Sequence, residues 1–303
     1  MDEKFIFTIV TPSFNQGMFI NDTIMSVLTQ KGDFFIDYII MDGGSKDNTI
    51  DVIKDWENKI TKSKSIEIYN KDFYYDNKYI KCNGISYQWI SCKDNGQVDA
   101  LKKGFADGVG SIYAWLNSDD IYLKDNVFEI VQNGFINNSS VKIITADGVF
   151  IDKMGQEFGK HKVDEINVKE LIYLDYHILQ PSTFFKKSIY NSEDLDESMV
   201  CAFDAKFFIK LFLSHKYLKV TNELSAFRIY AEIKTLSLSD KRYFESMLIL
   251  NEYSKNFFYN TISRLYKYFE ITKKPFIKLK SAKLMFRFLR DLSYLLVIKR
   301  LGR

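Results

Sequence analysis

Two adjacent carboxylates and an amide directly follow a short apolar run. Residues 112–116 are Ile-Tyr-Ala-Trp-Leu, and residues 117–120 are Asn-Ser-Asp-Asp. This order predicts a buried strand that delivers polar side chains to its carboxyl end, where open α/β sheets bind ligands. Adjacent carboxylates such as Asp119 and Asp120 repel unless they are compensated, and a hard divalent ion held against a phosphate would compensate them. A polar turn that caps the next helix is the alternative left open by this stretch alone.

Three other predicted strands end in polar loops. Thr11 ends the first strand, Asp42 ends the second, and Asp94 follows the third. Loops between a strand and a helix present backbone N–H groups to anions or base edges, and the glycine pair at 43–44 lets the chain turn sharply. Simple turn chemistry explains any one loop, but four strand ends of this kind favour a common site. Neither early loop has the dinucleotide or P-loop glycine pattern, which argues against a hydride-transfer enzyme and a P-loop nucleotidase.

Strand and helix patterns alternate through the first half of the chain. Strands are predicted at 5–11, 37–42, 86–92, 112–116 and 141–146, and helices at 19–30, 47–60, 97–106 and 125–137. This alternation predicts an α/β fold with a mostly parallel central sheet and helices on both faces. Residues 69–85 interrupt it and are interpreted as a surface excursion. The second half is less regular, with short strands or loops at 180–186 and 226–230 and helices at 203–214, 241–259 and 275–300.

Composition limits the classes that need to be considered. The chain has 303 residues, of which 46% are hydrophobic, enough for one large α/β domain with an appendage. No apolar run reaches the 18 residues of a membrane span, and no signal peptide is visible. The three cysteines have no metal-ligand spacing. We therefore expect a cytoplasmic protein without a zinc site.

The sequence phrases taken together resemble glycosyltransferase family 2, the inverting transferases with a Rossmann-like GT-A fold. The resemblance covers roughly residues 5–235 in order and spacing. It is carried by the phrases TPSFNQG at 11–17, DGGSKD at 42–47, DNGQVDALKKG at 94–104, WLNSDD at 115–120, QPSTFF at 180–185 and AFR at 226–228. Each phrase alone is weak, but the combination is specific. It implies a GT-A domain at 1–238, with a nucleotide-sugar half at 1–120 and an acceptor half at 121–238, followed by a basic helical extension at 239–303.

The resemblance implies a role for each matching residue. Those expected to bind the donor nucleotide are Thr11, Pro12, Asn15, Asp42, Gly43, Asp94, Gln97, Asn117 and Ser118. Asp119, with Asp120 beside it, corresponds to the metal-binding part of the DXD-type motif and implies Mn²⁺ or Mg²⁺ as cofactor. Asp204 matches the catalytic base, which must reach the acceptor hydroxyl on the far face of the sugar.

Two features depart from the family pattern. Tyr230 stands where members often have a histidine that touches the diphosphate or the metal, and a neutral phenol is a poor ligand for either ion. Arg228 or Lys234 is expected to bring positive charge to the diphosphate instead. The QxxRW phrase and the membrane spans of processive synthases are absent, so we expect transfer of a single sugar.

The C-terminal residues are strongly basic. Residues 240–303 carry 15 Lys or Arg and 5 Asp or Glu. In the helix predicted at 275–300, Lys283, Arg287 and Arg290 share one side, which suits peripheral contact of residues 275–303 with anionic lipid on the inner face of the cell membrane. A helix packed on the catalytic domain or in a homodimer is the alternative. No nucleic-acid-binding motif accompanies the charge, so nucleic acid is not an expected partner.

The expected function is therefore metal-dependent, inverting transfer from a nucleotide-diphospho-sugar, most simply a UDP-sugar. The acceptor would be a saccharide or a lipid-linked saccharide of a bacterial surface glycan. A sugar nucleotidyltransferase is an alternative, but residues 12–17 lack the basic residue that its first loop would need. A catalytically silent sugar-nucleotide-binding protein is the other alternative, opposed by the intact Asp119, Asp120 and Asp204. The sequence names neither the sugar nor the acceptor.

Overall fold

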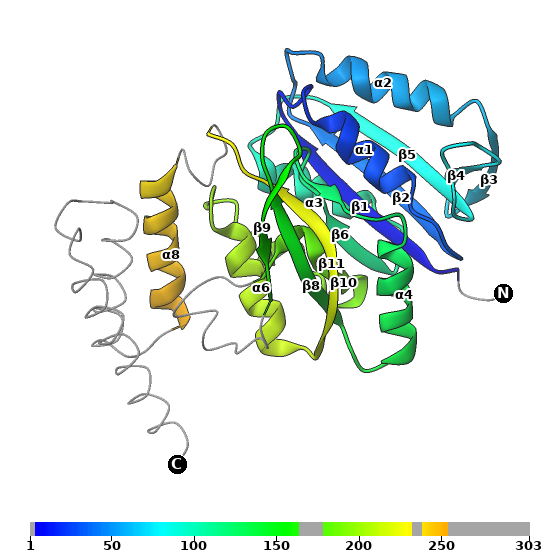
Figure 1. Cartoon of the computed structure of the whole chain (residues 1–303). Helices are drawn as coiled ribbons and strands as arrows, with labels where there is room; N and C mark the ends of the chain where they lie inside the picture. Colours follow the sequence, from blue (N-terminus) through cyan, green and yellow to red (C-terminus); the bar gives the residue numbers. More distant parts are fainter. Residues whose placement is uncertain (1–3, 164–177, 232–237, 254–303) are drawn as a thin grey trace.

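A computed structural model describes residues 4–163, 178–231 and 238–253 of the chain (Figure 1). Lys234, the end of the helix predicted at 241–259 and the whole helix predicted at 275–300 lie outside these residues. Among the helices that are described, none is long and apolar enough to cross a membrane.

The described strands form one mixed sheet of 11 strands in the order β3-β4-β5-β2-β1-β6-β10-β8-β11-β7, with β9 paired to β8. Their bounds are β1 Ile6–Ser13, β2 Phe35–Asp42, β3 Lys64–Ile68, β4 Lys71–Tyr75, β5 Gly84–Ser91, β6 Ile112–Trp115, β7 Ile121–Tyr122, β8 Ile143–Ile151, β9 Glu157–His161, β10 Phe184–Lys186 and β11 Tyr217–Arg228. Strands β5, β2, β1 and β6 are parallel neighbours. Their carboxyl ends therefore meet at one edge of the sheet, as the sequence predicts.

Helices cover both faces of this sheet (Figure 1). One apolar cluster joins the sheet to α1 (Ile20–Leu28), α2 (Thr49–Ile60) and α4 (Val127–Asn137). A second cluster joins it to α3 (Gln97–Asp107), α6 (Phe203–Ser214) and α8 (Ser239–Tyr253). Every residue of β1 is buried, which fits its mainly apolar and β-branched sequence, because strands covered on both faces show no regular polar alternation. The predicted α/β class with helices on both faces is confirmed.

The interpretation of residues 69–85 as a surface excursion is wrong for their first part. Strand β4 pairs with β3 and β5 and buries Phe73. The hairpin turn consists of Tyr69 and Asn70, both with positive φ. Two-residue hairpins need this conformation and usually contain Asn-Gly or Asp-Gly. The Tyr-Asn pair therefore gave no clear turn signal.

The second half of the sheet is also more extensive than predicted. Strand β8 continues to Ile151, and β11 begins at Tyr217 and pairs in parallel with it. The short strands β7 and β9 were not predicted. Phe184–Lys186 forms the strand β10 between β6 and β8, while Gln180–Ser182 forms a 3₁₀ turn before it.

Candidate active site

One cavity of about 610 Å³ lies beyond the carboxyl ends of the central parallel strands and is closed on another side by the start of α6. Nine of the predicted site residues line it: Pro12, Gly43, Asp94, Gln97, Asn117, Ser118, Asp119, Asp204 and Tyr230. Thr11, Asn15, Asp42, Asp120 and Arg228 lie next to it or behind its wall, as described below. The fold thus brings most of the predicted set together from separate loops.

Asp119 and Asp120 have different surroundings despite being adjacent. Asp119 faces the cavity, and its Oδ2 accepts a hydrogen bond from the Tyr230 hydroxyl at 2.8 Å. Asp120 is buried, and its two carboxylate oxygens accept from the Arg228 N–H at 2.9 Å and the Asn117 amide at 3.3 Å. Burial and the neighbouring Asp119 charge raise the pKa of Asp120 well above its usual value. Asp119 is therefore the carboxylate placed to meet a ligand, and Asp120 secures the loop.

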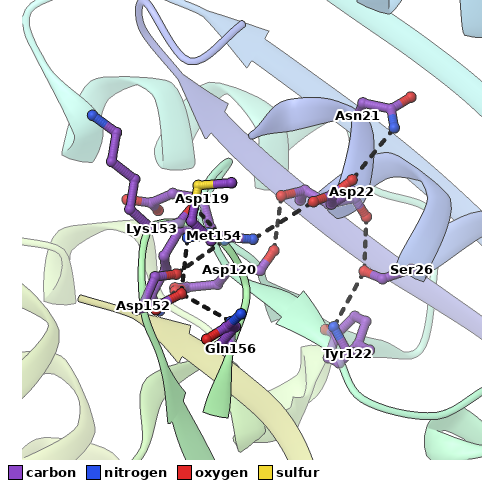
Figure 2. Close-up of polar contacts among 12 residues, drawn as sticks. Asn21, Asp22, Ser26, Asp119, Asp120, Tyr122, Asp152, Lys153, Met154 and Gln156 are labelled. Carbon is purple, nitrogen blue, oxygen red and sulfur yellow. Dashed lines mark hydrogen bonds and ion pairs between the residues drawn. The ribbon is translucent and has the colours of Figure 1, made fainter. Parts of the chain in front are cut away.

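Arg228 connects this loop to the turn between β8 and β9. Its Nε donates to the Asp119 carbonyl at 2.8 Å, and its Nη1 donates to the carbonyls of Asp152 and Lys153, both at 3.2 Å. The guanidinium also stands 3.7 Å from the Asp22 carboxylate of α1. Figure 2 shows Asp119 and Asp120 between Asp22 on one side and the turn at 152–156 on the other. Arg228 thus lies beside the cavity in a structural role, and its predicted contact with a diphosphate stays a prediction, as does that of Lys234.

A chain of side-chain amides forms part of the cavity wall. Gln97 donates to the Asn117 carbonyl oxygen at 2.7 Å, and the Asn117 amide donates to Gln180 at 3.2 Å. Gln180 in turn donates to the Trp115 carbonyl at the end of β6 at 2.6 Å. An aspartate at position 117 could not donate to Gln180. The asparagine at this position therefore makes a donor contact in the wall that an aspartate could not make.

Two residues predicted to bind the nucleotide, Asp42 and Asn15, make hydrogen bonds that hold the first two loops in shape. The Asp42 carboxylate accepts from the N–H groups of Gly44 and Ser45 and from the hydroxyls of Ser45 and Ser91. Asn15, with φ of 53°, accepts from the Lys46 N–H at 2.9 Å. In this structure Asp42 and Asn15 therefore shape the loops, and their direct contact with a nucleotide stays a prediction.

Thr11 and Gly43 allow close packing beneath the cavity, at the ends of β1 and β2. Thr11 is fully buried and shares a hydrogen bond of 3.1 Å with the Tyr38 hydroxyl. A Cβ at Gly43 would stand 3.0 Å from an Asp94 carboxylate oxygen, so a larger residue would push that side chain aside. Gly43 thus allows Asp94 to lie close to the end of β2 and to line the cavity. The contact of Thr11 with a base is not tested.

Asp204 lies in the first turn of α6 and faces the same cavity as Asp119. Burial raises the pKa of its carboxyl group to about 6, although the Ala205 N–H and the positive charge of Arg242 oppose the shift. A carboxylate whose pKa lies close to neutral is well suited to accept a proton in general base catalysis. The position and the pKa of Asp204 both fit the base predicted from the sequence.

Several cavity residues were not predicted. Ser13, Phe14, Gln16, Lys93, Gln180, Cys201, Phe203 and Phe227 also line it. Most of them are next in sequence to predicted site residues at strand ends. That adjacency is the feature of the sequence that could have indicated them. Ser13 is notable because its buried hydroxyl has no hydrogen-bond partner among the described residues. A buried donor of this kind is costly unless a ligand or water satisfies it.

Comparison with known proteins finds similarity for part of the sequence and for the fold. The Glycosyl transferase family 2 model matches residues 8–73, which include the first two loops of the cavity. A search of curated proteins finds no match. TarS 1–349 from S. aureus in complex with UDP-GlcNAc superposes with a TM-score of 0.60 at 14% identity, over 94% of this chain and 78% of that one.

Two further structures show the same fold. A longer TarS structure from S. aureus gives a TM-score of 0.58 at 14% identity, over 92% of this chain and 46% of that one, so the present chain spans about half its length. The mannosyltransferase PcManGT from Pyrobaculum calidifontis, in complex with GDP-Man and Mn²⁺, gives 0.55 at 8% identity, over 95% and 74%. The fold is the GT-A fold of glycosyltransferases. The match of residues 8–73 to the family model adds a sequence similarity to this likeness in fold.

The residues around Asp119 fit a divalent ion only if the substrate provides further ligands. No cluster of three His, Cys, Asp or Glu side chains occurs among the residues described. Mg²⁺ typically needs only one or two carboxylates when substrate phosphates and water complete its shell. Asp119 meets this requirement. Asp120 suits it less, because its oxygens already accept hydrogen bonds inside the protein.

Proposed function

We propose that the chain is an inverting glycosyltransferase that moves one sugar from a UDP-sugar to a hydroxyl of a saccharide or lipid-linked acceptor. One observation carries the proposal: Asp119, in the loop after β6, and Asp204, in the first turn of α6, face the same cavity. The cavity has a size typical of small-molecule sites. It therefore offers room for a donor next to Asp119 with an acceptor next to Asp204.

The reaction needs a base on one side of the sugar and charge stabilisation on the other. Asp204 takes the proton of the acceptor hydroxyl while the acceptor oxygen forms a bond to the anomeric carbon. The bond from that carbon to the phosphate oxygen breaks, and the electron pair leaves with the nucleoside diphosphate. Attack from the face opposite the leaving group inverts the configuration.

We further propose that Asp119 binds Mn²⁺ or Mg²⁺ together with the donor diphosphate. A bound ion supplies positive charge that stabilises the leaving nucleoside diphosphate. Support comes from the single cavity-facing carboxylate of the Asp pair and from the PcManGT complex, which contains Mn²⁺. Tyr230 keeps Asp119 oriented through its hydroxyl.

The choice of a uridine nucleotide is supported by the TarS complexes with UDP and UDP-GlcNAc. The Ser13 hydroxyl, which has no partner among the described residues, is available to a donor in the cavity. We propose that the product contributes to a bacterial surface polysaccharide made on the cytoplasmic side of the membrane.

A panel of nucleotide sugars tests the proposed function. The full chain is incubated with each donor and Mn²⁺ or Mg²⁺, with and without chelator, and release of nucleoside diphosphate is measured in the presence of candidate saccharide acceptors. Metal-dependent release from a UDP-sugar, with an inverted product linkage by NMR, is the expected result. Binding of UDP-sugars by calorimetry without release from any donor and acceptor pair would instead indicate a silent binding protein.

A further inference from the structure

The base-bearing segment is held by a residue far along the chain. The Glu245 carboxylate, on α8, accepts from three consecutive backbone N–H groups just before α6: Val200 at 2.8 Å, Cys201 at 2.7 Å and Ala202 at 2.9 Å. Glu245 is only 3% exposed. Val200 and Cys201 line the cavity, as does Asp204 two residues beyond Ala202. One side chain of α8 thus fixes part of the cavity wall.

Helix α6 has no cap of its own that could replace this contact. Its N-cap residue is Ala202, which makes no side-chain capping bond and is among the poorest residues at this position. The first N–H groups of a helix need acceptors from elsewhere. Glu245 satisfies the N–H of Ala202 and those of the two residues before it. A negative charge is also favoured at this end of the helix dipole.

We propose that Glu245 is a positioning residue for sugar transfer, which fixes the backbone of residues 200–202 and so sets the orientation of Asp204 in the cavity. This inference rests on the proposed function of the site. It means that α8, the first helix after residue 238, completes the catalytic site even though none of its described side chains lines the cavity.

The charges of α8 support a connection between this helix and Asp204. Arg242 lowers the pKa of Asp204 and Glu245 raises it, so both residues of α8 act on the base across the packing contact. Burial of Asp204 is the larger cause of its raised pKa. Loss of the charge at 245 should therefore shift the pKa of Asp204 downward without removing the effect of burial.

Glu245→Gln in the full chain tests the proposal, with Glu252→Gln as the matched control. Glu252 also lies on α8 and pairs with Lys206 of α6 at 2.9 Å, but it is exposed and does not contact residues 200–202. We expect Glu245→Gln to lower kcat at least tenfold with the donor KM within twofold, and to shift the acid limb of the pH profile to lower pH. Glu252→Gln should keep kcat within twofold and leave the pH profile unchanged.

Hydrogen exchange provides a second measurement that does not depend on activity. Deuterium uptake by a peptide covering residues 198–206 should rise at least tenfold in rate in Glu245→Gln and remain at the parental rate in Glu252→Gln. Unchanged uptake in Glu245→Gln, or parental kcat and pH profile, would overturn the proposal. If the parent protein transferred no sugar, the proposed function would fail while the exchange rates still decided whether Glu245 holds this segment.

Discussion

The carboxyl groups of Asp204 and Asp196 have pKa values shifted in opposite directions by their surroundings. Burial disfavours the charged form of Asp204, and the Ala205 N–H, the Arg242 charge and the backbone N–H of Asp204 itself offset this in part, so its pKa rises to about 6. Asp196, a few residues earlier, accepts hydrogen bonds from Ser198 and Lys206, and its pKa is lowered. The proposed base is thus the carboxylate of this segment that is ready to take a proton near neutral pH.

Asp204→Asn should abolish the base and keep the shape of the site. We expect kcat to fall by about 10²–10⁴-fold, the usual contribution of a general base, while the affinity for the donor stays within a few-fold. Transfer kinetics and donor calorimetry measure the two effects. Asp55→Asn on α2 is the control because Asp55 is exposed and its ion pair is with the neighbouring Lys59. Full activity of Asp204→Asn would refute the assignment.

The pH dependence follows from the same group. Asp204 must be ionised to act, so activity should fall about tenfold per pH unit below its pKa of about 6. The folded-state pKa lies above the ordinary value, so the folded protein holds the proton more tightly than the unfolded chain. The contribution of this group to stability is therefore present at low pH and lost as the pH rises through about 6. Asp204→Asn should lose this pH dependence in urea denaturation between pH 4 and pH 7.

Asp119 should control the response to metal. Asp119→Asn removes the charge that would hold the ion, and we expect transfer to fall about 100-fold, the equivalent of about 2.7 kcal/mol of charge stabilisation. The remaining activity should respond little to chelator. Asp51→Asn, at an exposed position of α2, is the control. Wild-type metal dependence in Asp119→Asn would assign the ion to other residues.

At the scale of elements, a buried ion pair joins β4, the strand next to the edge strand β3, to the central strand β2. The Lys71 ammonium lies 2.9 Å from the Asp37 carboxylate of β2, and both side chains are buried. The other Asp37 oxygen accepts from Thr8 of β1 and from the Val109 N–H, each at 2.9 Å. This network lies below the cavity and connects two of the strands whose ends form it.

Lys71→Met should therefore be strongly destabilising. It leaves the Asp37 charge buried without its partner, which typically costs about 3–5 kcal/mol. Urea denaturation of the folded protein measures the loss. Lys64→Met, which removes an exposed ion pair with Asp76 on the neighbouring strands, should change stability little. Equal effects of the two substitutions would show that Lys71 contributes no more than a surface charge.

At the scale of the whole molecule, two apolar clusters enclose the sheet, and the site lies where both meet its edge. Residues from α1, α2 and α4 make the first cluster, and residues from α3, α6 and α8 make the second. Interiors packed in this way hold their neighbours rigidly. The loop that carries Asp119 and the helix α6 that carries Asp204 are therefore held on a rigid frame.

Binding to membranes is predicted for the full chain from its basic end, residues 275–303, which lie outside the described residues. We expect sedimentation with vesicles that contain anionic lipid, weakened at high salt because the attraction is electrostatic. Combined substitution of Lys283→Glu, Arg287→Glu and Arg290→Glu should release the protein from these vesicles. Equal binding of the triple variant would contradict the prediction, and vesicles of neutral lipid are the control.

The sequence alone determined the class of fold and the neighbourhood of the site. Apolar runs that end in Thr11, Asp42 and Leu116 predict parallel strands, and the carboxyl ends of parallel strands share one edge for reasons of geometry. The bounds of α6 follow from its apolar spacing and were predicted as they are observed. Predictions from local patterns of this kind agree with the structure because each pattern matches the burial of its element in the fold.

Only the tertiary structure decided which polar side chains face the cavity. Asp119 and Asp120 are adjacent in the sequence and of the same type, yet their surroundings differ. The Arg228 backbone N–H donates to the Asp120 carboxylate, whereas Asp119 lines the cavity. The Asp42 carboxylate accepts hydrogen bonds within the turn that it organises. Glu245 accepts hydrogen bonds from residues 200–202 although it lies on a helix far along the chain. Hydrogen bonds between residues far apart in the chain depend on packing, and no local pattern contains that information.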